Sequence, residues 1–291
     1  MFKTFSSLTK FGIVIFVLLT GVAGYATGYQ VEVPFDWKHF FTFIAGLYFL
    51  SSGSLALNQV QEYKLDQKMP RTKNRPIASG KITPAAGLIL SVAMLFCGFN
   101  LLHSLSPMAG YVSAFSVALY NGFYTCIWKP KWIFAAVPGA IPGALPITIG
   151  YAVNNEHIFN SDSIYLFLIM FLWQMPHFWT LAIKYKEDYR LGGIPTLPTA
   201  LGVKKTVFQV GLYTFCYAGV ALAAPFFLHT SWFFVALVFP FAFMLLKEFF
   251  TMYRTDADKW LPFFMWTNIS LLVFTFVPVI DKWSFLVIDR V

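Results

Sequence analysis

Long uninterrupted apolar blocks make up most of the chain, and short polar stretches separate them. A helix of about 20 apolar residues spans the hydrocarbon core of a bilayer, whereas barrel strands show about ten alternating positions. Only helices and closed barrels satisfy their backbone hydrogen bonds within lipid. The blocks therefore predict an all-α, polytopic membrane bundle that forms one transmembrane domain over residues 1–291. We expect about nine spans, at approximately 11–29, 39–57, 84–104, 108–128, 132–152, 163–183, 207–229, 232–250 and 261–280.

Composition supports this prediction. Hydrophobic residues make up 58% of the chain and charged residues only 12%, against about a quarter in soluble domains. So few charges could not cover the surface of a soluble protein of this length. The first apolar block follows Lys3 and Lys10, as in a secretory signal, but no convincing cleavage site follows it, so we predict a retained span.

The positions of the basic residues predict the orientation in the membrane. A net charge of +8 could indicate a nucleic-acid partner, but the charges follow the predicted sides of the membrane. With an inside N-terminus and nine spans, only Lys38, Lys282 and Arg290 among the 21 Lys and Arg residues fall outside. This asymmetry is typical of membrane proteins. It predicts an inside N-terminus, an outside C-terminus and no nucleic-acid partner.

The first polar segment, residues 58–76, begins inside the second predicted span. Asn58, Glu62 and Asp66 are four residues apart, so a helix places their oxygen-bearing side chains on one face. Hard cations such as Mg²⁺ bind oxygen ligands and complete their shell with water and substrate phosphates. Basic residues suited to phosphate oxygens follow at once. They are Lys68, Arg71, Lys73 and Arg75.

A solvated basic loop that obeys the positive-inside rule would explain these Lys and Arg residues. It would not explain two acids and an amide on one face at the end of a membrane helix, where ionisable groups are costly. The segment therefore predicts a magnesium and diphosphate site at the inner ends of the helices.

The second polar segment is residues 173–198. His177, Lys184 and Asp188 are seven and four residues apart, which predicts one common helical face. For His177 a buried structural histidine is an alternative, and for Lys184 and Asp188 a surface ion pair is another. Two acid-bearing helix ends on one side suggest two magnesium ions on one diphosphate, because ionising an allylic diphosphate requires stabilisation of the leaving charge.

At these two segments the sequence resembles the UbiA superfamily of intramembrane prenyltransferases, and within it the haem O synthases, or protoheme IX farnesyltransferases. The superfamily's first motif, an Asn followed four and eight residues later by acids, is matched by Asn58, Glu62 and Asp66. The haem O synthase pattern continues to Pro76, and residues 173–198 match its second segment, Trp-Gln-x-Pro-His-Phe-Trp followed by Lys, Asp-Tyr and Gly-Ile-Pro.

A weaker match covers the fifth predicted span. Ile147 stands where the family often has the second of two prolines, and Tyr151 stands where it often has Trp. After the fourth predicted span, where the family often has Lys-Arg, this chain has only Lys129.

The resemblance implies a UbiA-like fold and a reaction. Farnesyl diphosphate would ionise with the help of Mg²⁺, a vinyl group of haem B would attack the allylic cation, and water would complete haem O. Haem O is a precursor of haem A, the cofactor of haem-copper oxidases. The resemblance further implies a bacterial inner membrane and an active site that faces the cytoplasm. Whether the product passes directly to a haem A synthase stays open.

The resemblance also implies roles for individual residues. The expected catalytic magnesium ligands are Asn58, Glu62, Asp66 and Asp188. The expected diphosphate contacts are Lys68, Arg71, Lys73, Arg75, Tyr124, Lys184, Lys186 and Arg190. His177 is the candidate for the haem, either as an iron ligand or as a propionate partner.

Two other functions stay open. A UbiA-type enzyme that prenylates an aromatic quinone precursor should carry a second Asp-rich cluster, whereas this chain has His177, Lys184 and Lys186 near those places. A transporter or a haem-binding membrane subunit should carry polar residues near mid-membrane. Here the charges gather at the inner helix ends.

Overall fold

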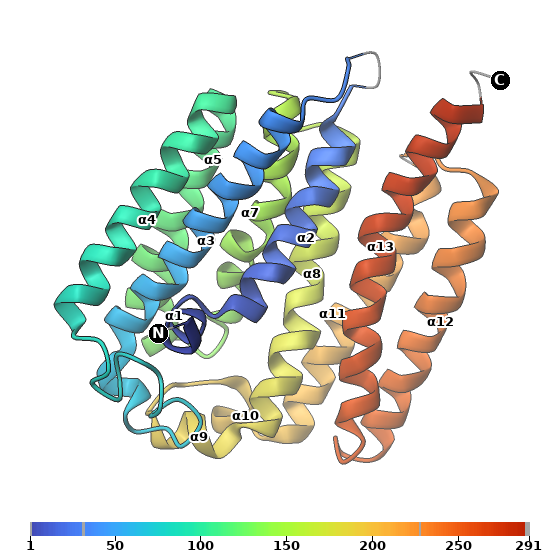
Figure 1. Ribbon diagram of the computed structural model, residues 1–291. Coiled ribbons are helices and arrows are strands. Elements are labelled where there is room, and N and C mark those ends of the chain that lie inside the picture. Colours follow the sequence, from blue (N-terminus) through green and yellow to red (C-terminus); the bar gives the residue numbers. More distant parts are fainter. Residues whose placement is uncertain (1, 31–32, 227, 289–291) are drawn as a thin grey trace.

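Long helices packed side by side form the structure (Figure 1). The computed structural model describes residues 2–30, 33–226 and 228–288, and these contain helices but no strand. The long helices are α2 (Phe11–Gly28), α3 (Trp37–Asp66), α4 (Pro84–Leu105), α5 (Pro107–Val117), the π-helix η1 (Ala118–Trp128), α7 (Ala136–Asn154), α8 (Ser161–Lys184), α11 (Val203–Ala223), α12 (Trp232–Arg254) and α13 (Trp260–Ile288). The short helices are α1 (Phe2–Thr9), α6 (Lys129–Lys131), α9 (Lys186–Leu191), α10 (Leu197–Ala200) and the 3₁₀ turn η2 (Ala224–Phe226).

The predicted all-α membrane bundle is confirmed. Within the described residues, eight helical segments are long and apolar enough to cross a membrane. The remaining predicted span, 108–128, is formed by α5 and η1, which follow one another without a break in the helical backbone. Helix α3 continues beyond the predicted end of its span and ends at Asp66, so the whole acidic motif lies on a regular helix.

Local sequence explains where several helices begin. The Asp36 carboxylate accepts hydrogen bonds from the backbone N–H groups of Lys38 and His39 at the start of α3. Helices α4 and α5 each begin with a proline behind an N-cap hydroxyl, from Thr83 and Ser106 respectively. These side chains satisfy donors that the first turn of a helix leaves without partners.

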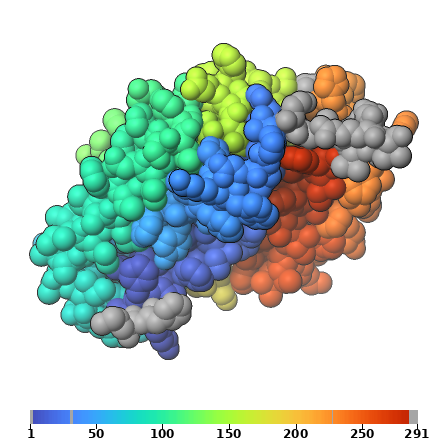
Figure 2. All heavy atoms as spheres, turned by 45° about the horizontal axis from the view of Figure 1, so that its top comes forward, coloured from blue at the N-terminus to red at the C-terminus, as the bar shows by residue number. Residues whose placement is uncertain are grey.

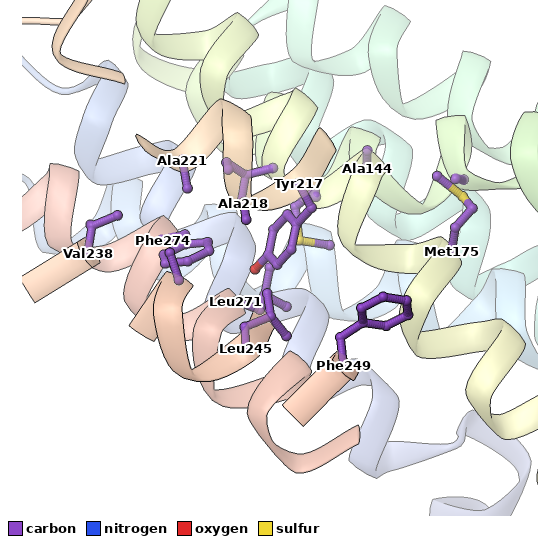
Figure 3. Packing of buried hydrophobic residues seen from close by; sticks show 14 of the residues in the cluster. Ala144, Met175, Tyr217, Ala218, Ala221, Val238, Leu245, Phe249, Leu271 and Phe274 are labelled. Atoms are coloured by element: carbon purple, nitrogen blue, oxygen red, sulfur yellow. The ribbon is translucent and has the colours of Figure 1, made fainter. Parts of the chain in front are cut away.

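Two hydrophobic cores lie side by side. The first joins α2, α3, α4, α5 and α7 through side chains such as Phe43, Leu102 and Ile149. The second joins α7, α8, α11, α12 and α13, and Figure 3 shows Tyr217, Phe249 and Phe274 among its aromatic members. Helix α7 contributes to both cores, so it connects the two halves of the bundle.

Small residues allow α2 and α7 to cross closely. A Cβ atom added at Gly24 would lie 1.8 Å from the carbonyl oxygen of Ile147, and one at Gly150 would lie 2.0 Å from the carbonyl oxygen of Gly21. Close backbone approach at small residues is a common way for membrane helices to pack.

The last helix closes the bundle against the first span. The Trp283 indole N–H donates to the Ala26 carbonyl over 3.2 Å, and Lys282 donates to the Thr27 carbonyl. In Figure 2 the red residues of α13 accordingly lie against the blue residues of the N-terminal helices. Helix α1 lies toward the end of the bundle that also carries α9 and α10, whereas α13 ends at the opposite end (Figure 1). Arg290, one of the three basic residues predicted outside, lies beyond the described residues.

Candidate active site

A cavity of about 860 Å³ lies between the two halves of the bundle. Its walls come from α2, α3, α5, η1, α6, α7, α8, α9 and α13, from Lys10 and from the loops that follow α3 and α9. One part, the charged wall, consists of Lys10, Asn58, Glu62, Asp66, Arg71, Arg75 and Lys129. Another part, the aromatic wall, consists of Trp173, His177 and Phe264.

Three side chains of α3 form the acidic part of the charged wall. Asn58, Glu62 and Asp66 are all buried and all line the cavity. The common face predicted from their spacing is therefore confirmed. Their oxygen atoms are the kind of donor that a hard cation such as Mg²⁺ binds. Within the described residues no group of three or more His, Cys, Asp or Glu side chains gathers as a metal site.

The two carboxylates of this wall are neutralised by basic side chains. The Lys129 ammonium lies 2.5 and 2.7 Å from the two carboxylate oxygens of Glu62. One guanidinium nitrogen of Arg75 lies 2.7 and 2.8 Å from the two carboxylate oxygens of Asp66. Burial acts to lower the pKa of Lys129, but the adjacent Glu62 charge outweighs it and raises the pKa above its ordinary value.

The third basic partner comes from the N-terminal segment. The Lys10 ammonium donates to Asn58 Oδ1 over 3.2 Å. Lys10 has a left-handed backbone, with φ 52°, at the corner between α1 and α2. Helix α1 is bound to α3 because the Gln59 amide donates to the carbonyls of Ser7 and Leu8.

The environment of Lys10 disfavours its charged form. The pKa of its ammonium group is lowered to about 7, mainly by burial and then by the positive charges of Arg75 and Lys129, while the negative charges of Glu62 and Asp66 partly offset this.

The second predicted segment is not one continuous helix. Helix α8 ends at Lys184, Tyr185 has a non-helical backbone, with φ −105° and ψ 28°, and α9 begins at Lys186. Lys184 keeps the predicted face with His177, because both lie on α8 and both contact α13, at Trp260 and Phe264. The face does not extend to Asp188 as predicted, because the interruption at Tyr185 changes the direction of the residues that follow it. The Lys184 ammonium lies 5.6 Å from the ring centroid of Trp260 on α13.

Asp188 does not pair with Lys184 but contacts Arg71 of the first polar segment. Its carboxylate lies 3.7 Å from Arg71 Nε. The Arg71 guanidinium also lies over the rings of Tyr185 and Tyr189, at 4.8 and 5.8 Å from their centroids, a favourable cation–π arrangement. Arg71 lines the cavity, so it joins the two polar segments at the site.

The other predicted diphosphate contacts lie outside the cavity lining. Arg190 forms a surface ion pair with Glu187 at 2.7 Å. The predicted diphosphate contacts that do not line the cavity are Lys68, Lys73, Lys184, Lys186 and Arg190.

His177 lies on the aromatic wall. Its ring is 4.4 Å from the ring of Trp173 and 4.8 Å from the ring of Phe264, centroid to centroid. Asn268 lies next to its side chain, and its Nδ1 atom is buried and has no hydrogen-bond partner in the described part of the chain. All four of these residues line the cavity.

Tyr124 also lines the cavity, as does Tyr120, which the sequence did not predict. The two rings are stacked with centroids 5.7 Å apart and an interplanar angle of 20°. Gly139 of α7 lies against Tyr124, since a Cβ atom there would lie 2.5 Å from the ring.

Sequence reasoning did not predict Lys10 and Lys129 as site residues. For Lys129 a signal existed, because it stands where the resembled family often has Lys-Arg. For Lys10 there was none, since nothing in its local sequence separates it from other basic residues beside a first span.

The model of the UbiA prenyltransferase family matches residues 14–271. The chain belongs to the UbiA prenyltransferase family. It is 66% identical, over the whole length of both chains, to a protoheme IX farnesyltransferase of Bdellovibrio bacteriovorus.

Solved structures share the UbiA fold. A digeranylgeranylglyceryl phosphate synthase superposes with a TM-score of 0.76 at 16% identity, covering 96% of this chain and 98% of that one. A UbiA homologue of Archaeoglobus fulgidus bound to GPP and Mg²⁺ superposes with a TM-score of 0.65 at 12% identity, covering 95% and 99%. The chain is thus an integral membrane protein with the fold of this family.

Proposed function

We propose that the chain transfers the farnesyl group of farnesyl diphosphate to a vinyl group of haem B, giving haem O and diphosphate. One observation carries this proposal. A single cavity joins a charged wall to an aromatic wall, in a chain 66% identical throughout to a protoheme IX farnesyltransferase. Farnesyl diphosphate needs both surfaces, because its head is anionic and its tail is apolar.

The charged wall is proposed to bind the diphosphate together with Mg²⁺. Asn58, Glu62 and Asp66 would hold the metal on one side, and Asp188 would contribute from the second segment. Bound Mg²⁺ would stabilise the negative charge that the leaving diphosphate carries away. The magnesium-bound homologue of Archaeoglobus fulgidus supports a metal site in this fold.

The basic side chains of the wall are proposed to change partners when substrate arrives. Lys129 and Arg75 neutralise Glu62 and Asp66. Once cations bind those carboxylates, the ammonium and guanidinium groups are available to diphosphate oxygens, for which Arg offers paired donors. Lys10 and Arg71 line the same wall and would add to this binding.

The basic residues outside the cavity lining would act differently. They are proposed to raise the local concentration of the anionic substrate by long-range attraction, without contacting the bound diphosphate. They are Lys68, Lys73, Lys184, Lys186 and Arg190.

The proposed reaction balances as follows. The allylic C–O bond of farnesyl diphosphate breaks, and its electron pair leaves with the diphosphate. The vinyl carbon of haem B forms a new C–C bond to the farnesyl cation, which places the positive charge beside the porphyrin. Water adds there and loses one proton, giving a hydroxyethylfarnesyl side chain. The Tyr120 and Tyr124 rings on the cavity wall would stabilise the transient cation through their π faces.

The aromatic wall is proposed to bind the haem. Trp173 and Phe264 present flat apolar surfaces on either side of His177, which suits a planar tetrapyrrole. His177 is then either a ligand of the haem iron or a partner of a propionate.

The proposed orientation places the N-terminus and the charged wall on the cytoplasmic side of a bacterial inner membrane. The basic residues around α1, the loop after α3 and α9 support it, because Lys and Arg favour the cytoplasmic side. A haem A synthase is the class of enzyme that would consume the product.

The function can be tested in membranes that contain the chain, haem B, farnesyl diphosphate and Mg²⁺. Chromatography should show haem O, and chelation of Mg²⁺ should prevent its formation. A preparation that prenylates an aromatic quinone precursor and makes no haem O would replace the proposal with that activity. Membranes carrying the Asp66→Asn variant are the matched negative control.

A further inference from the structure

Helix η1 is unusual because eleven consecutive residues, Ala118–Trp128, are π-helical. π-helices are rare, mostly occur as single turns inside α-helices, and are frequent at functional sites. The backbone N–H of Lys129 donates to the Tyr124 carbonyl, five residues back. The hydroxyl of Thr125 and the thiol of Cys126 likewise bond carbonyls five residues back, those of Tyr120 and Asn121.

The π-helical register decides which side chains reach the cavity. Tyr120, Tyr124 and Lys129 all line it, although Lys129 follows Tyr120 by nine residues. In an α-helix nine residues are about two and a half turns, so Tyr120 and Lys129 would lie on opposite faces. In a π-helix, with about 4.4 residues per turn, nine residues make about two full turns and the two side chains lie on one face.

The exposed side of η1 agrees with this register. Ile127 follows Tyr120 by seven residues, which is about two turns of an α-helix. An α-helix would therefore direct Ile127 toward the cavity. Instead Ile127 is 46% exposed and Phe123 is 48% exposed on the outside of the bundle.

A buried asparagine connects η1 to α3. Asn121 is 4% exposed, and its amide group donates to the Ser54 carbonyl at 3.0 Å and to Gln61 Oε1 at 3.2 Å. Its Oδ1 accepts from the Ser54 hydroxyl at 2.6 Å, and its backbone carbonyl accepts from the Gln61 amide at 2.9 Å. One turn on, the Thr125 hydroxyl accepts from the Asn58 amide at 3.2 Å.

We propose that η1 is a positioning element of the site, in which Asn121 holds the π-helical segment on α3 so that Lys129 reaches Glu62 and the substrate. The inference rests on the proposed function, because the ligand whose binding depends on Lys129 is the prenyl diphosphate. Asn121 is a positioning residue, since it lines no part of the cavity and acts through Lys129.

The experiment measures binding of a non-hydrolysable farnesyl diphosphate analogue in the presence of Mg²⁺, with the detergent-solubilised full chain. Lys129→Gln and Asn121→Leu are each expected to weaken binding about tenfold, and the double variant should be no weaker than Lys129→Gln alone, as coupled residues are non-additive. Asn100→Leu is the matched control, because the Asn100 amide is exposed and donates to the Phe96 carbonyl of its own helix. It should bind normally.

A second pair of variants tests the register without depending on Asn121. Adding Ile127→Lys to Lys129→Gln should not restore binding, because residue 127 points away from the cavity. Restoration would show an α-helical register and would overturn the inference. Multiplicative losses in the Asn121 and Lys129 double variant would overturn it as well.

The proposed function and the positioning role of Asn121 can fail separately. If the unsubstituted chain does not bind the analogue with Mg²⁺, the proposed function fails and this inference fails with it. If that chain binds normally but the variants behave independently, only the inference fails.

Discussion

The two polar segments of the chain look alike in sequence and differ in structure. The first continues a membrane helix without interruption, so Asn58, Glu62 and Asp66 lie on one buried face of the cavity. The second is broken at Tyr185, and its charges separate, with Lys184 on a tryptophan ring and Asp188 on Arg71. Residue spacing predicts a common face only where the helix is continuous.

The difference also separates the proposed tasks. The first segment carries buried acids with basic partners, which is suited to a metal and a diphosphate. The second contributes aromatic rings around His177 and a single acid at the edge. One segment is thus proposed to bind the donor and the other mainly the acceptor.

The largest effect should come from the first segment. Asp66→Asn is expected to lower the rate of haem O formation about 10³-fold or more, because a ligand that stabilises leaving-group charge is lost. The measurement is turnover in membranes at saturating haem B. Asp258→Asn, a change at an exposed acid, should leave turnover unaltered. Substantial activity in Asp66→Asn would contradict the magnesium role of this face.

Breaking the contact between the two segments should have a smaller effect. Asp188→Asn is expected to lower turnover about 10- to 100-fold, as loss of a residue that orients or completes a metal site does. Arg71→Gln should reduce turnover as well, and the two losses should not multiply, because the residues are in contact. Fully multiplicative losses would mean that the two segments act separately.

Substitutions on the aromatic wall should weaken recognition of haem B and leave recognition of farnesyl diphosphate almost unchanged. His177→Leu is expected to raise the KM for haem B about tenfold and to change the KM for farnesyl diphosphate less than about twofold, since it removes one contact on the aromatic wall. Asn268→Leu should act in the same direction. Equal changes in both KM values would show that the aromatic wall does not distinguish acceptor from donor.

The smallest effect should come from the basic residues outside the cavity. Lys184→Met and Arg190→Gln are expected to change turnover less than about twofold at physiological salt, because exposed charges are screened. At low ionic strength the apparent KM for farnesyl diphosphate should rise slightly in both variants. A tenfold loss in either would show direct contact with the diphosphate.

The sequence by itself determined the class of fold and the acidic face. Apolar blocks long enough to span a bilayer leave few alternatives to a helical bundle, and the four-residue spacing of Asn58, Glu62 and Asp66 is a local property of one helix. The motif around them was also sufficient to indicate the family, because its residues are close together in the chain.

Only the tertiary structure decided which cations meet these acids. Lys10 and Lys129 are 48 and 67 residues away in sequence from the α3 side chains that they contact, and no local pattern encodes such a pairing. The break at Tyr185 and the π-helical register of η1 were equally inaccessible. Both are departures from regular α-helical geometry. Predictions from residue spacing assume 3.6 residues per turn and therefore miss such departures. In the folded chain Asn121 of η1 is hydrogen-bonded to α3, and Lys184 beside the break contacts Trp260 of α13.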